Sequence, residues 1–299
     1  MNYSIEKITQ FINADRYGDA AASISFLLTD SRSLCFPEET LFFALKSDRN
    51  DGHHYIPELY RRGVRNFVVE NVPDNFSTLY KHANFLKVSN TLVALQQLTT
   101  HHRKAFDIPV VGITGSNGKT MVKEWLSQLL SYDRNVTRSP KSYNSQIGVP
   151  LSVWLLNESS QIGLIEAGIS KVGEMQALHD IILPTVGVLT SLGSAHQENF
   201  SSLEEKCNEK LLLFKGTQAL VYQLDDKIAA KCITAAHYDG QLLAWSEHDT
   251  TAAFYVNSIE KHETTSTINY IWQQTTQGSY TLPFIDDASI SDSITCAVV

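Results

Sequence analysis

The chain has 299 residues, of which 43% are hydrophobic and 19% are charged. This composition is too apolar for a disordered protein, and the length favours one large α/β domain with a smaller partner domain. The formal net charge of -8 excludes a global electrostatic attraction to nucleic acid or to an anionic membrane. Any phosphate group must therefore be bound by a local site.

The N-terminal sequence and the cysteine pattern predict a cytoplasmic protein. The first residues lack the apolar core of a signal peptide, and the longest apolar stretch, residues 181–189, is interrupted by Pro184 and Gly187. The four cysteines are scattered, with no CxxC pair and no histidine at zinc-ligand spacing. We expect reduced thiols, no membrane insertion and no nucleic-acid partner.

The first part of the chain has the short, mixed patterns of a small α/β domain. Apolar residues that include Ile56 and Leu59 predict a helix over residues 53–62. Strands are expected at residues 24–28, 41–45, 66–70 and 85–88. A domain junction is predicted at residues 89–90, which divides the chain into domains 1–89 and 90–299.

Strands and helices alternate beyond this junction, as in a mostly parallel sheet with crossover helices. Amphipathic stripes predict helices over residues 91–103, 119–130 and 203–214, and a further helix beginning near residue 288. Strands are expected at residues 108–113, 162–166 and 186–190, and an antiparallel meander at residues 253–256, 267–271 and 280–284. The predicted fold class is α/β, with a small N-terminal domain followed by a P-loop domain.

The segment from Thr114 to Thr120 reads TGSNGKT and lies between a predicted strand and a predicted helix. Such a loop can curl its backbone amides around phosphate oxygens, while a lysine reaches the β- and γ-phosphates and a threonine hydroxyl ligates Mg²⁺. The alternative is an ordinary strand-to-helix turn whose glycines serve only backbone geometry. The candidate phosphate-binding residues are Gly115, Ser116, Asn117, Gly118, Lys119 and Thr120.

Three more polar residues lie where the strands and helices of such a sheet meet its ligand crevice. Glu166 ends a predicted strand, His196 follows the next one, and Lys210 flanks an apolar helix stripe. Each also has an ordinary explanation, as an exposed strand end, a loop histidine and a surface lysine.

Together these motifs resemble the Mur ligases, most closely the MurF type. The similar segments are TGSNGKT at 114–120, NSQIGVP at 144–150, EAG at 166–168, TSLGSAH at 190–196, EKLLLF at 209–214, TDSR at 29–32, LFFALK at 41–46 and DGH at 51–53. Ser145 and Ser191 stand where the family has asparagine, and Asp292 replaces an asparagine that contacts the nucleotide.

The resemblance implies roles for particular residues. Lys119 and the loop amides would hold ATP, Thr120 and Glu166 would ligate Mg²⁺, and His196 would ligate a second Mg²⁺. Lys210 would be carbamylated, which turns an amine into an oxygen ligand suited to Mg²⁺. Lys119, Glu166, His196 and Lys210 would be the catalytic residues. Asp292 would contact the nucleotide, and Asp30, Ser31, Arg32, Lys46 and Asn144 would bind the UDP-linked substrate.

The implied activity is an ATP-dependent amide ligation in peptidoglycan precursor synthesis. It joins D-Ala-D-Ala to UDP-MurNAc-tripeptide through an acyl phosphate. The chain stops before the C-terminal domain of the family, so we expect this fragment alone to be inactive, and its loosely kept motifs resemble ligases fused to an alanine racemase. The alternatives are a MurE-like or folylpolyglutamate-synthetase-like ligase and a non-catalytic nucleotide-binding module.

Overall fold

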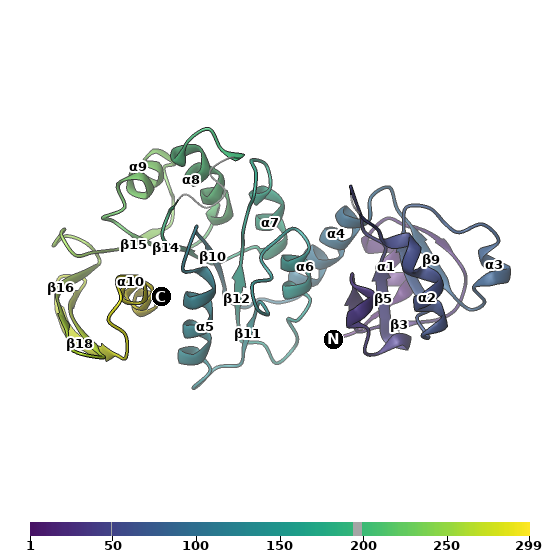
Figure 1. Ribbon diagram of the computed structural model, residues 1–299, viewed down its shortest axis with the longest axis horizontal. Helices are drawn as coiled ribbons and strands as arrows, with labels where there is room; N and C mark the ends of the chain where they lie inside the picture. The colour runs from purple at the N-terminus through teal and green to yellow at the C-terminus, as the bar shows by residue number, and fades with distance from the viewer. Residues whose placement is uncertain (49, 194–198) are drawn as a thin grey trace. The chain divides into compact units, whose positions relative to one another are not determined.

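The computed structural model describes residues 1–48, 50–193 and 199–299. The chain forms two compact units, Met1–Phe106 and Asp107–Val299 (Figure 1). Each unit combines helices with a mostly parallel sheet, which confirms the predicted α/β class. None of the helices in the described part of the chain has the length and apolar content that a bilayer crossing requires.

The first unit is built on a five-stranded sheet with the strand order β2-β9-β8-β5-β4. Its strands are β2 (Asp15–Tyr17), β4 (Phe26–Leu28), β5 (Thr40–Phe43), β8 (Asn66–Val69) and β9 (Asn84–Lys87). Neighbouring strands from β4 to β9 run parallel, and β2 pairs antiparallel with β9. Every residue of β5 and β8 is buried, which explains why three apolar residues follow one another in each strand after its polar first residue.

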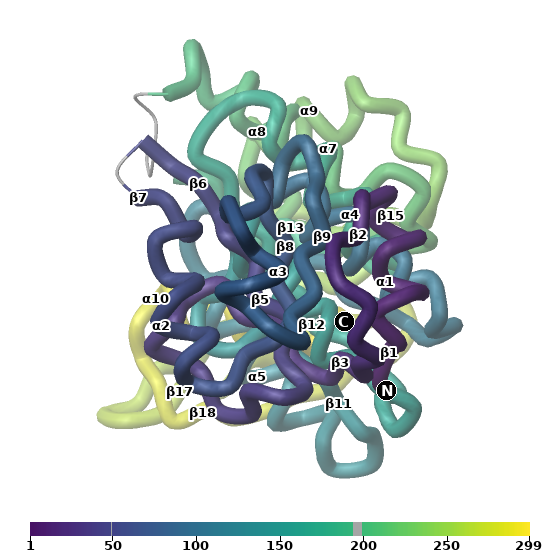
Figure 2. Tube along the Cα trace, turned by 90° about the vertical axis from the view of Figure 1, so that its right-hand side faces the viewer, coloured from purple at the N-terminus to yellow at the C-terminus, as the bar shows by residue number. Residues whose placement is uncertain are grey.

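Helices and short pairings complete the first unit, drawn in purple and blue in Figure 2. The α-helices are α1 (Ile5–Phe11), α2 (Ile56–Arg61), α3 (Phe76–Leu79) and α4 (Thr91–Arg103), and the 3₁₀ turns are η1 (Ser31–Ser33), η2 (Pro37–Glu39) and η3 (Gly52–Tyr55). The two-stranded pairings join β1 (Tyr3–Ser4) to β3 (Ser23–Ile24) and β6 (Lys46–Ser47) to β7 (Asn50–Asp51).

Helix α4 begins and ends at the predicted residues but packs within the first unit. Asn90 caps it, because the Asn90 side chain accepts hydrogen bonds from the amides of Leu92 and Val93. Its buried residues Leu95 and Leu98 face this unit, where α4 contacts α1, β5 and β8. The compact unit therefore extends to Phe106, beyond the junction predicted at residues 89–90.

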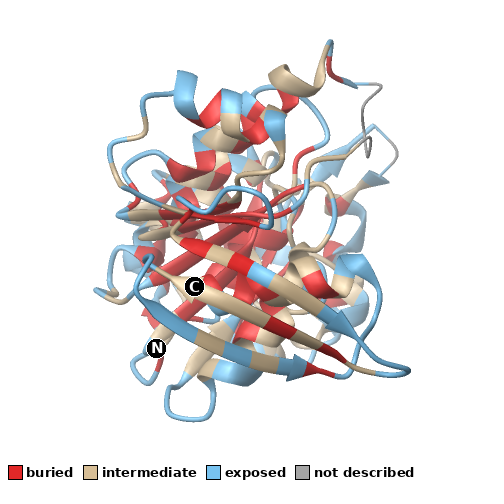
Figure 3. Cartoon of the chain, turned by 90° about the vertical axis from the view of Figure 1, so that its left-hand side faces the viewer, coloured by how far each residue is buried: buried red, intermediate tan, exposed pale blue. Residues whose placement is uncertain are grey.

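The second unit is built on a nine-stranded sheet with the order β11-β12-β10-β13-β14-β15-β16-β17-β18. Its strands are β10 (Val110–Thr114), β11 (Val136–Arg138), β12 (Ile162–Glu166), β13 (Val186–Leu189), β14 (Ala219–Gln223), β15 (Gln241–Ser246), β16 (Phe254–Lys261), β17 (Ser266–Trp272) and β18 (Thr276–Leu282). Strands β11 to β16 run parallel, and β16, β17 and β18 form the predicted antiparallel meander. Figure 3 shows buried central strands and a meander with mixed burial.

Helices cover the faces of this sheet. They are α5 (Lys119–Leu130), α6 (Gly148–Val153), α7 (Met175–Ile182), α8 (Leu203–Leu211) with the 3₁₀ turn η5 (Leu212–Phe214), α9 (Lys227–Ala235) and α10 (Asp287–Val298). Helix α10 packs against β15 and α5, since Trp245 Nε1 donates to Thr295 Oγ1 at 3.1 Å and Cys296 Sγ lies 3.7 Å from the Val122 carbonyl. This packing places Asp292 of α10 beside Gly118, in the loop before α5.

Candidate active site

The loop between β10 and α5 has the backbone of a phosphate-binding loop. Gly115 and Gly118 adopt φ angles of 155° and 85°, in the region that favours glycine. A Cβ atom at Gly115 would overlap Thr190 Oγ1, and one at Gly118 would overlap Asp292 Oδ1. Gly118 is also the N-cap of α5 and has no side chain to occupy the first amides of the helix. The positive end of this helix dipole is therefore available to an anion.

Lys119 folds back over this loop from the first turn of α5. Its Nζ donates to the Gly115 carbonyl at 2.9 Å and to the Ser116 carbonyl at 3.1 Å. Burial lowers the pKa of Lys119, the Glu166 charge raises it and the Lys206 charge lowers it. The ammonium is thus held beside the loop by weak neutral acceptors that an incoming phosphate can replace.

Lys210 reaches the same loop from α8. Its Nζ donates to the Gly115 carbonyl at 3.0 Å, and the residue is 2% exposed. Burial, the Lys119 charge and the Lys206 charge lower the pKa of Lys210 to about 7, although Cys207 acts to raise it. A substantial fraction of this amine is therefore neutral, and so nucleophilic, at neutral pH.

Glu166 lies at the carboxyl end of β12, which is paired with β10. Glu166 is 1% exposed; its Oε2 accepts from the Thr120 hydroxyl at 3.0 Å and its Oε1 from the Asn144 amide at 2.7 Å. Lys123 Nζ lies 3.7 Å from Glu166 Oε2, and Ser142 Oγ lies 3.3 Å from Thr120 Oγ1. A carboxylate and two hydroxyls thus converge, and such hard oxygen donors suit Mg²⁺.

No group of three or more His, Cys, Asp or Glu side chains that could hold a metal occurs among the described residues. The oxygen set at Glu166 contains one carboxylate, so a bound Mg²⁺ would need further oxygens from nucleotide phosphates or water, as this ion commonly does. His196, the predicted ligand of a second Mg²⁺, lies outside the described residues.

The segment after β13 supports the phosphate loop from the other side. The Thr190 hydroxyl donates to the Asn117 carbonyl at 2.6 Å, and the Ser116 amide donates to the Ser191 carbonyl at 2.8 Å. The Ser116 hydroxyl donates to the Gly193 carbonyl at 3.1 Å. Because β13 pairs with β10, the two loops leave the same edge of the sheet together.

Asp292 extends from α10 to the phosphate loop. Its carboxylate lies against Gly118, close enough to leave no room for a Cβ atom there. Burial, with a contribution from the Asp286 charge, raises the pKa of Asp292 to about 6. The predicted nucleotide-contacting residue is therefore beside the loop, but as an acid rather than an amide.

The variant Asp292→Asn should raise the melting temperature above pH 6. The folded protein favours the protonated acid, because the pKa of Asp292 is raised from 3.8 to about 6. Ionising this group costs stability, which is lost as the pH rises from about 4 through about 6. The neutral amide removes that cost, so the difference between variant and wild type should vanish near pH 4 in thermal melts.

Asp287→Asn is the matched control for this experiment, since Asp287 lies on the same helix with its side chain 93% exposed. This control should show no comparable gain above pH 6. An Asp292→Asn variant with a pH profile parallel to that of the wild type would contradict the expectation.

The predicted UDP-sugar residues lie near the surface of the first unit. Asp30 caps η1 and forms an ion pair of 2.6 Å with Arg32, whose side chain is 88% exposed. The Ser31 carbonyl accepts from Arg62 Nη1 at 2.8 Å, and Lys46 is exposed in β6. The structure brings Asp30, Ser31 and Arg32 together as one turn.

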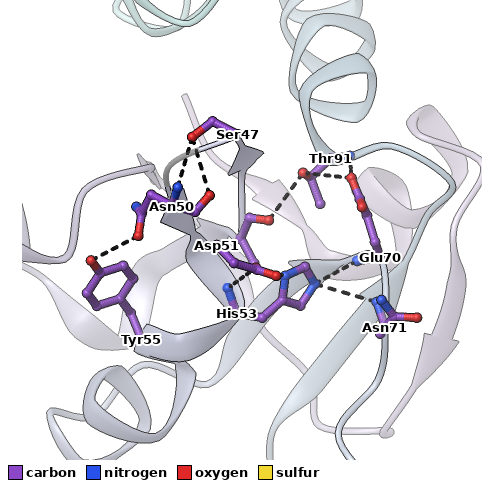
Figure 4. Close-up of polar contacts among 9 residues, drawn as sticks. Ser47, Asn50, Asp51, His53, Tyr55, Glu70, Asn71 and Thr91 are labelled. Atoms are coloured by element: carbon purple, nitrogen blue, oxygen red, sulfur yellow. Dashed lines mark hydrogen bonds and ion pairs between the residues drawn. The ribbon is translucent and has the colours of Figure 1, made fainter.

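The DGH motif has a structural role in the first unit (Figure 4). Asp51 Oδ1 lies 2.6 Å from His53 Nδ1, while His53 Nε2 accepts from the Glu70 amide at 3.0 Å. This pattern requires the neutral tautomer with its proton on Nδ1. Glu70 Oε1 in turn accepts from the Thr91 amide at 3.2 Å, so the motif ties the end of β8 to the start of α4.

Sequence reasoning missed two lysines of the site, Lys123 and Lys206. Lys123 is completely buried beside Glu166, and Lys206 is 2% exposed and donates to the Gly193 carbonyl at 2.6 Å. Each lies four residues from a predicted lysine, Lys119 or Lys210, so each shares a helix face with it. This four-residue spacing was the feature of the sequence that could have identified Lys123 and Lys206.

Comparison with known proteins decides the family. Residues 113–299 match the model of the Mur ligase middle domain. The chain belongs to the Mur ligase family. Its match contains the phosphate loop, Glu166, Lys210 and Asp292.

Relatives of this Mur ligase agree with the assignment. It is 32% identical over 247 residues to the UDP-N-acetylmuramoyl-tripeptide–D-alanyl-D-alanine ligase of Bacillus subtilis (strain 168), a match that covers 78% of this chain and 52% of that protein. This chain thus spans about half the length of that curated relative.

Solved structures show the same fold. A crystal structure of MurF from Acinetobacter baumannii superposes with a TM-score of 0.89 at 23% identity, covering 100% of this chain and 64% of that one. The MurF ligase of Thermotoga maritima in complex with ADP gives a TM-score of 0.77 at 25% identity, covering 90% of this chain and 61% of that one.

Proposed function

We propose that this chain provides the nucleotide- and UDP-sugar-binding parts of a MurF-type ligase, which joins D-Ala-D-Ala to UDP-MurNAc-tripeptide at the expense of ATP. The observation that carries the proposal is the contact of Thr120 and Asn144 with the buried carboxylate of Glu166, directly beside the phosphate loop. The relative in Bacillus subtilis is named for this reaction. The substrates place the proposed activity in the cytoplasm, where ATP and nucleotide-linked precursors are made.

ATP would transfer its γ-phosphoryl group to the terminal carboxylate of the tripeptide, which would give an acyl phosphate and release ADP. The amine of D-Ala-D-Ala would then attack the acyl carbon, the C–O bond to phosphate would break as the amide bond forms, and phosphate and one proton would leave. The residues of this chain bind and orient the reacting groups and stabilise the charge that spreads over the transferred phosphoryl oxygens.

The phosphate loop fits a nucleotide triphosphate. The Gly115–Gly118 backbone and the N-terminus of α5 would hold the phosphates, with Ser116 and Asn117 in the loop and Lys119 over it. Asp292 would contact the nucleotide from α10. The Thr120 hydroxyl and the Glu166 carboxylate would hold Mg²⁺, with Asn144 orienting Glu166.

Lys210 and His196 would form a second Mg²⁺ site. The neutral fraction of the Lys210 amine can add CO₂ to give a carbamate, with release of one proton. The buried position beside Gly115 would then contain an anionic oxygen ligand in place of a third ammonium.

The first unit would bind the UDP-linked substrate. The turn of Asp30, Ser31 and Arg32 presents an exposed guanidinium, which is suited to a diphosphate or a uracil edge, and Lys46 adds a second exposed cation. These assignments rest on motif similarity and surface exposure together.

Isothermal titration of this chain with UDP-MurNAc-tripeptide and with a non-hydrolysable ATP analogue tests the proposal. We expect both ligands to bind. We expect Arg32→Ala to weaken binding of the muramyl peptide and to leave binding of the ATP analogue unchanged. A chain that binds the ATP analogue but shows no heat with the muramyl peptide would favour a non-catalytic nucleotide-binding module or a folate-type ligase. Binding of the UDP-linked dipeptide in preference to the tripeptide would favour a MurE-like enzyme.

A further inference from the structure

Helix α8 presents two buried lysines on one face to two different segments of the site. Lys210 Nζ donates to the Gly115 carbonyl at 3.0 Å, and Lys206, one turn earlier, donates to the Gly193 carbonyl at 2.6 Å. Both residues are 2% exposed. The helix is itself fixed, since Glu209 Oε1 accepts from the amides of Gly173 and Met175 at 2.9 and 3.0 Å.

The Gly193 carbonyl joins Lys206 to the phosphate loop. It accepts from Lys206 and also from the hydroxyl of Ser116, at 2.6 and 3.1 Å. A Cβ atom on Gly193 would lie 3.3 Å from Asn117 Nδ2, so the segment after β13 is in close contact with the loop. Lys206 therefore holds this segment against the residues expected to bind phosphate.

Lys206 also adds positive charge to the site. Burial is the main cause that lowers the pKa of Lys119, and the Lys206 charge also acts to lower it. Burial and the Lys119 charge lower the pKa of Lys210, and the Lys206 charge adds to their effect. The described hydrogen bonds of Lys119 end on backbone carbonyls rather than on carboxylates, although the charge of Glu166 acts to raise the pKa of Lys119. Bringing the positive charges of Lys119 and Lys206 together in a buried site is unfavourable, and a polyanion bound beside them would relieve the repulsion.

We infer that Lys206 is a positioning residue of the phosphate site that makes this chain favour nucleoside triphosphates over nucleoside diphosphates. It fixes the Gly193 segment on Ser116, and its charge stabilises the additional negative charge of the terminal phosphate. This inference rests on the proposed nucleotide-binding function and concerns a residue for which the motifs supplied no role.

The test compares binding of ADP and of the β,γ-imido ATP analogue, each with Mg²⁺, by isothermal titration. Lys206→Met should weaken binding of the triphosphate analogue about tenfold to a hundredfold, because a charged hydrogen-bonding group is lost. Its affinity for ADP should change little, whereas Lys206→Arg should retain most of the preference for triphosphate. Lys231→Met, which removes a charge from a side chain that is 73% exposed on α9, is the matched control and should behave as the wild type.

The outcomes separate this inference from the proposed function. A wild-type chain that binds neither nucleotide would contradict the proposed function itself. A wild-type chain that prefers the triphosphate, with Lys206→Met keeping the same preference or losing affinity for both nucleotides equally, would overturn the role of Lys206 alone.

A second measurement covers the case in which Lys206→Met fails to fold. In wild-type chain labelled with ¹⁵N-lysine, the Nζ resonance of Lys206 is assigned by its loss in Lys206→Arg. This resonance should shift more with the triphosphate analogue than with ADP. Equal shifts with the two nucleotides, or none, would overturn the inference.

Discussion

Replacement of Lys119 by alanine is expected to weaken binding of the ATP analogue to this chain about a hundredfold, the scale of losing a preorganised charged donor. The Lys119 ammonium already lies over the loop, 2.9 Å from the Gly115 carbonyl and 3.1 Å from that of Ser116. Because it is held in place before the nucleotide arrives, little ordering of the side chain is needed on binding. Isothermal titration with and without Mg²⁺ measures the loss.

Two variants sharpen this measurement. Lys227→Ala removes an exposed lysine at the start of α9 and should leave nucleotide binding unchanged. Lys119→Arg keeps the charge but changes the shape of the donor group, and should fall between the wild type and Lys119→Ala. Undiminished affinity in a folded Lys119→Ala chain would show that the segment is an ordinary strand-to-helix turn.

Loss of the Lys210 side chain is expected to abolish a carbamate signal in this chain. In ¹³CO₂-equilibrated buffer, ¹³C NMR should show one protein carbamate that is absent from Lys210→Ala. Its intensity should rise with pH through about 7, because the pKa of Lys210 is lowered to about 7 and only the neutral amine adds CO₂. Below that pH the amine is protonated, so the signal should disappear on acidification.

The exposed residue Lys215, at the end of η5, provides the control for this experiment. Lys215→Ala should retain the signal. Mg²⁺ should strengthen the carbamate in the wild type by ligating its oxygens. In an assay of the proposed MurF-type ligation, Lys210→Ala should be nearly inactive, and added short carboxylates should restore part of the rate. An unchanged carbamate resonance in Lys210→Ala would contradict the assignment.

Elements with one clear apolar stripe could be predicted from the sequence. Helix α5 begins and ends at the predicted residues, since Val122 and Leu126 form a regular buried face and Gly118 precedes the first turn. The buried strand β12 was equally well predicted. In both cases local periodicity and tertiary packing favour the same structure.

Other elements were missed because local patterns merge or shift. Helix α7 ends at Ile182, and its C-cap residue Leu183 adopts a left-handed φ of 44°. Leucine rarely adopts this conformation, so the sequence does not indicate it. The apolar stretch from 181 to 189 contains the end of α7 and the whole of β13. The strand was predicted, at residues 186–190, but the helix before it was not. The predicted helix at residues 53–62 begins as a 3₁₀ turn and becomes α-helical at Ile56.

The candidate site divides in the same way. The phosphate loop and Glu166 were predicted, because each is marked by a local pattern, a loop motif in one case and the end of an apolar strand in the other. The involvement of Lys123 and Lys206 was not, because their contacts with Glu166 and Gly193 depend on how α5 and α8 pack on the sheet. Asp292 was named from a motif, but its contact with Gly118 depends on the packing of α10.

The phosphate loop is local in sequence, but its supports are not. The contact of Lys210 with Gly115 spans 95 residues, and the contact of Cys296 with Val122, which seats α10 on α5, spans 174. During synthesis the loop therefore emerges well before the groups that hold it, and such long-range contacts form late in folding. A nucleotide that binds only the assembled loop would selectively stabilise chains in which α8 and α10 have already docked. Nucleotide concentration in the cell would then influence how much of the newly made protein completes folding.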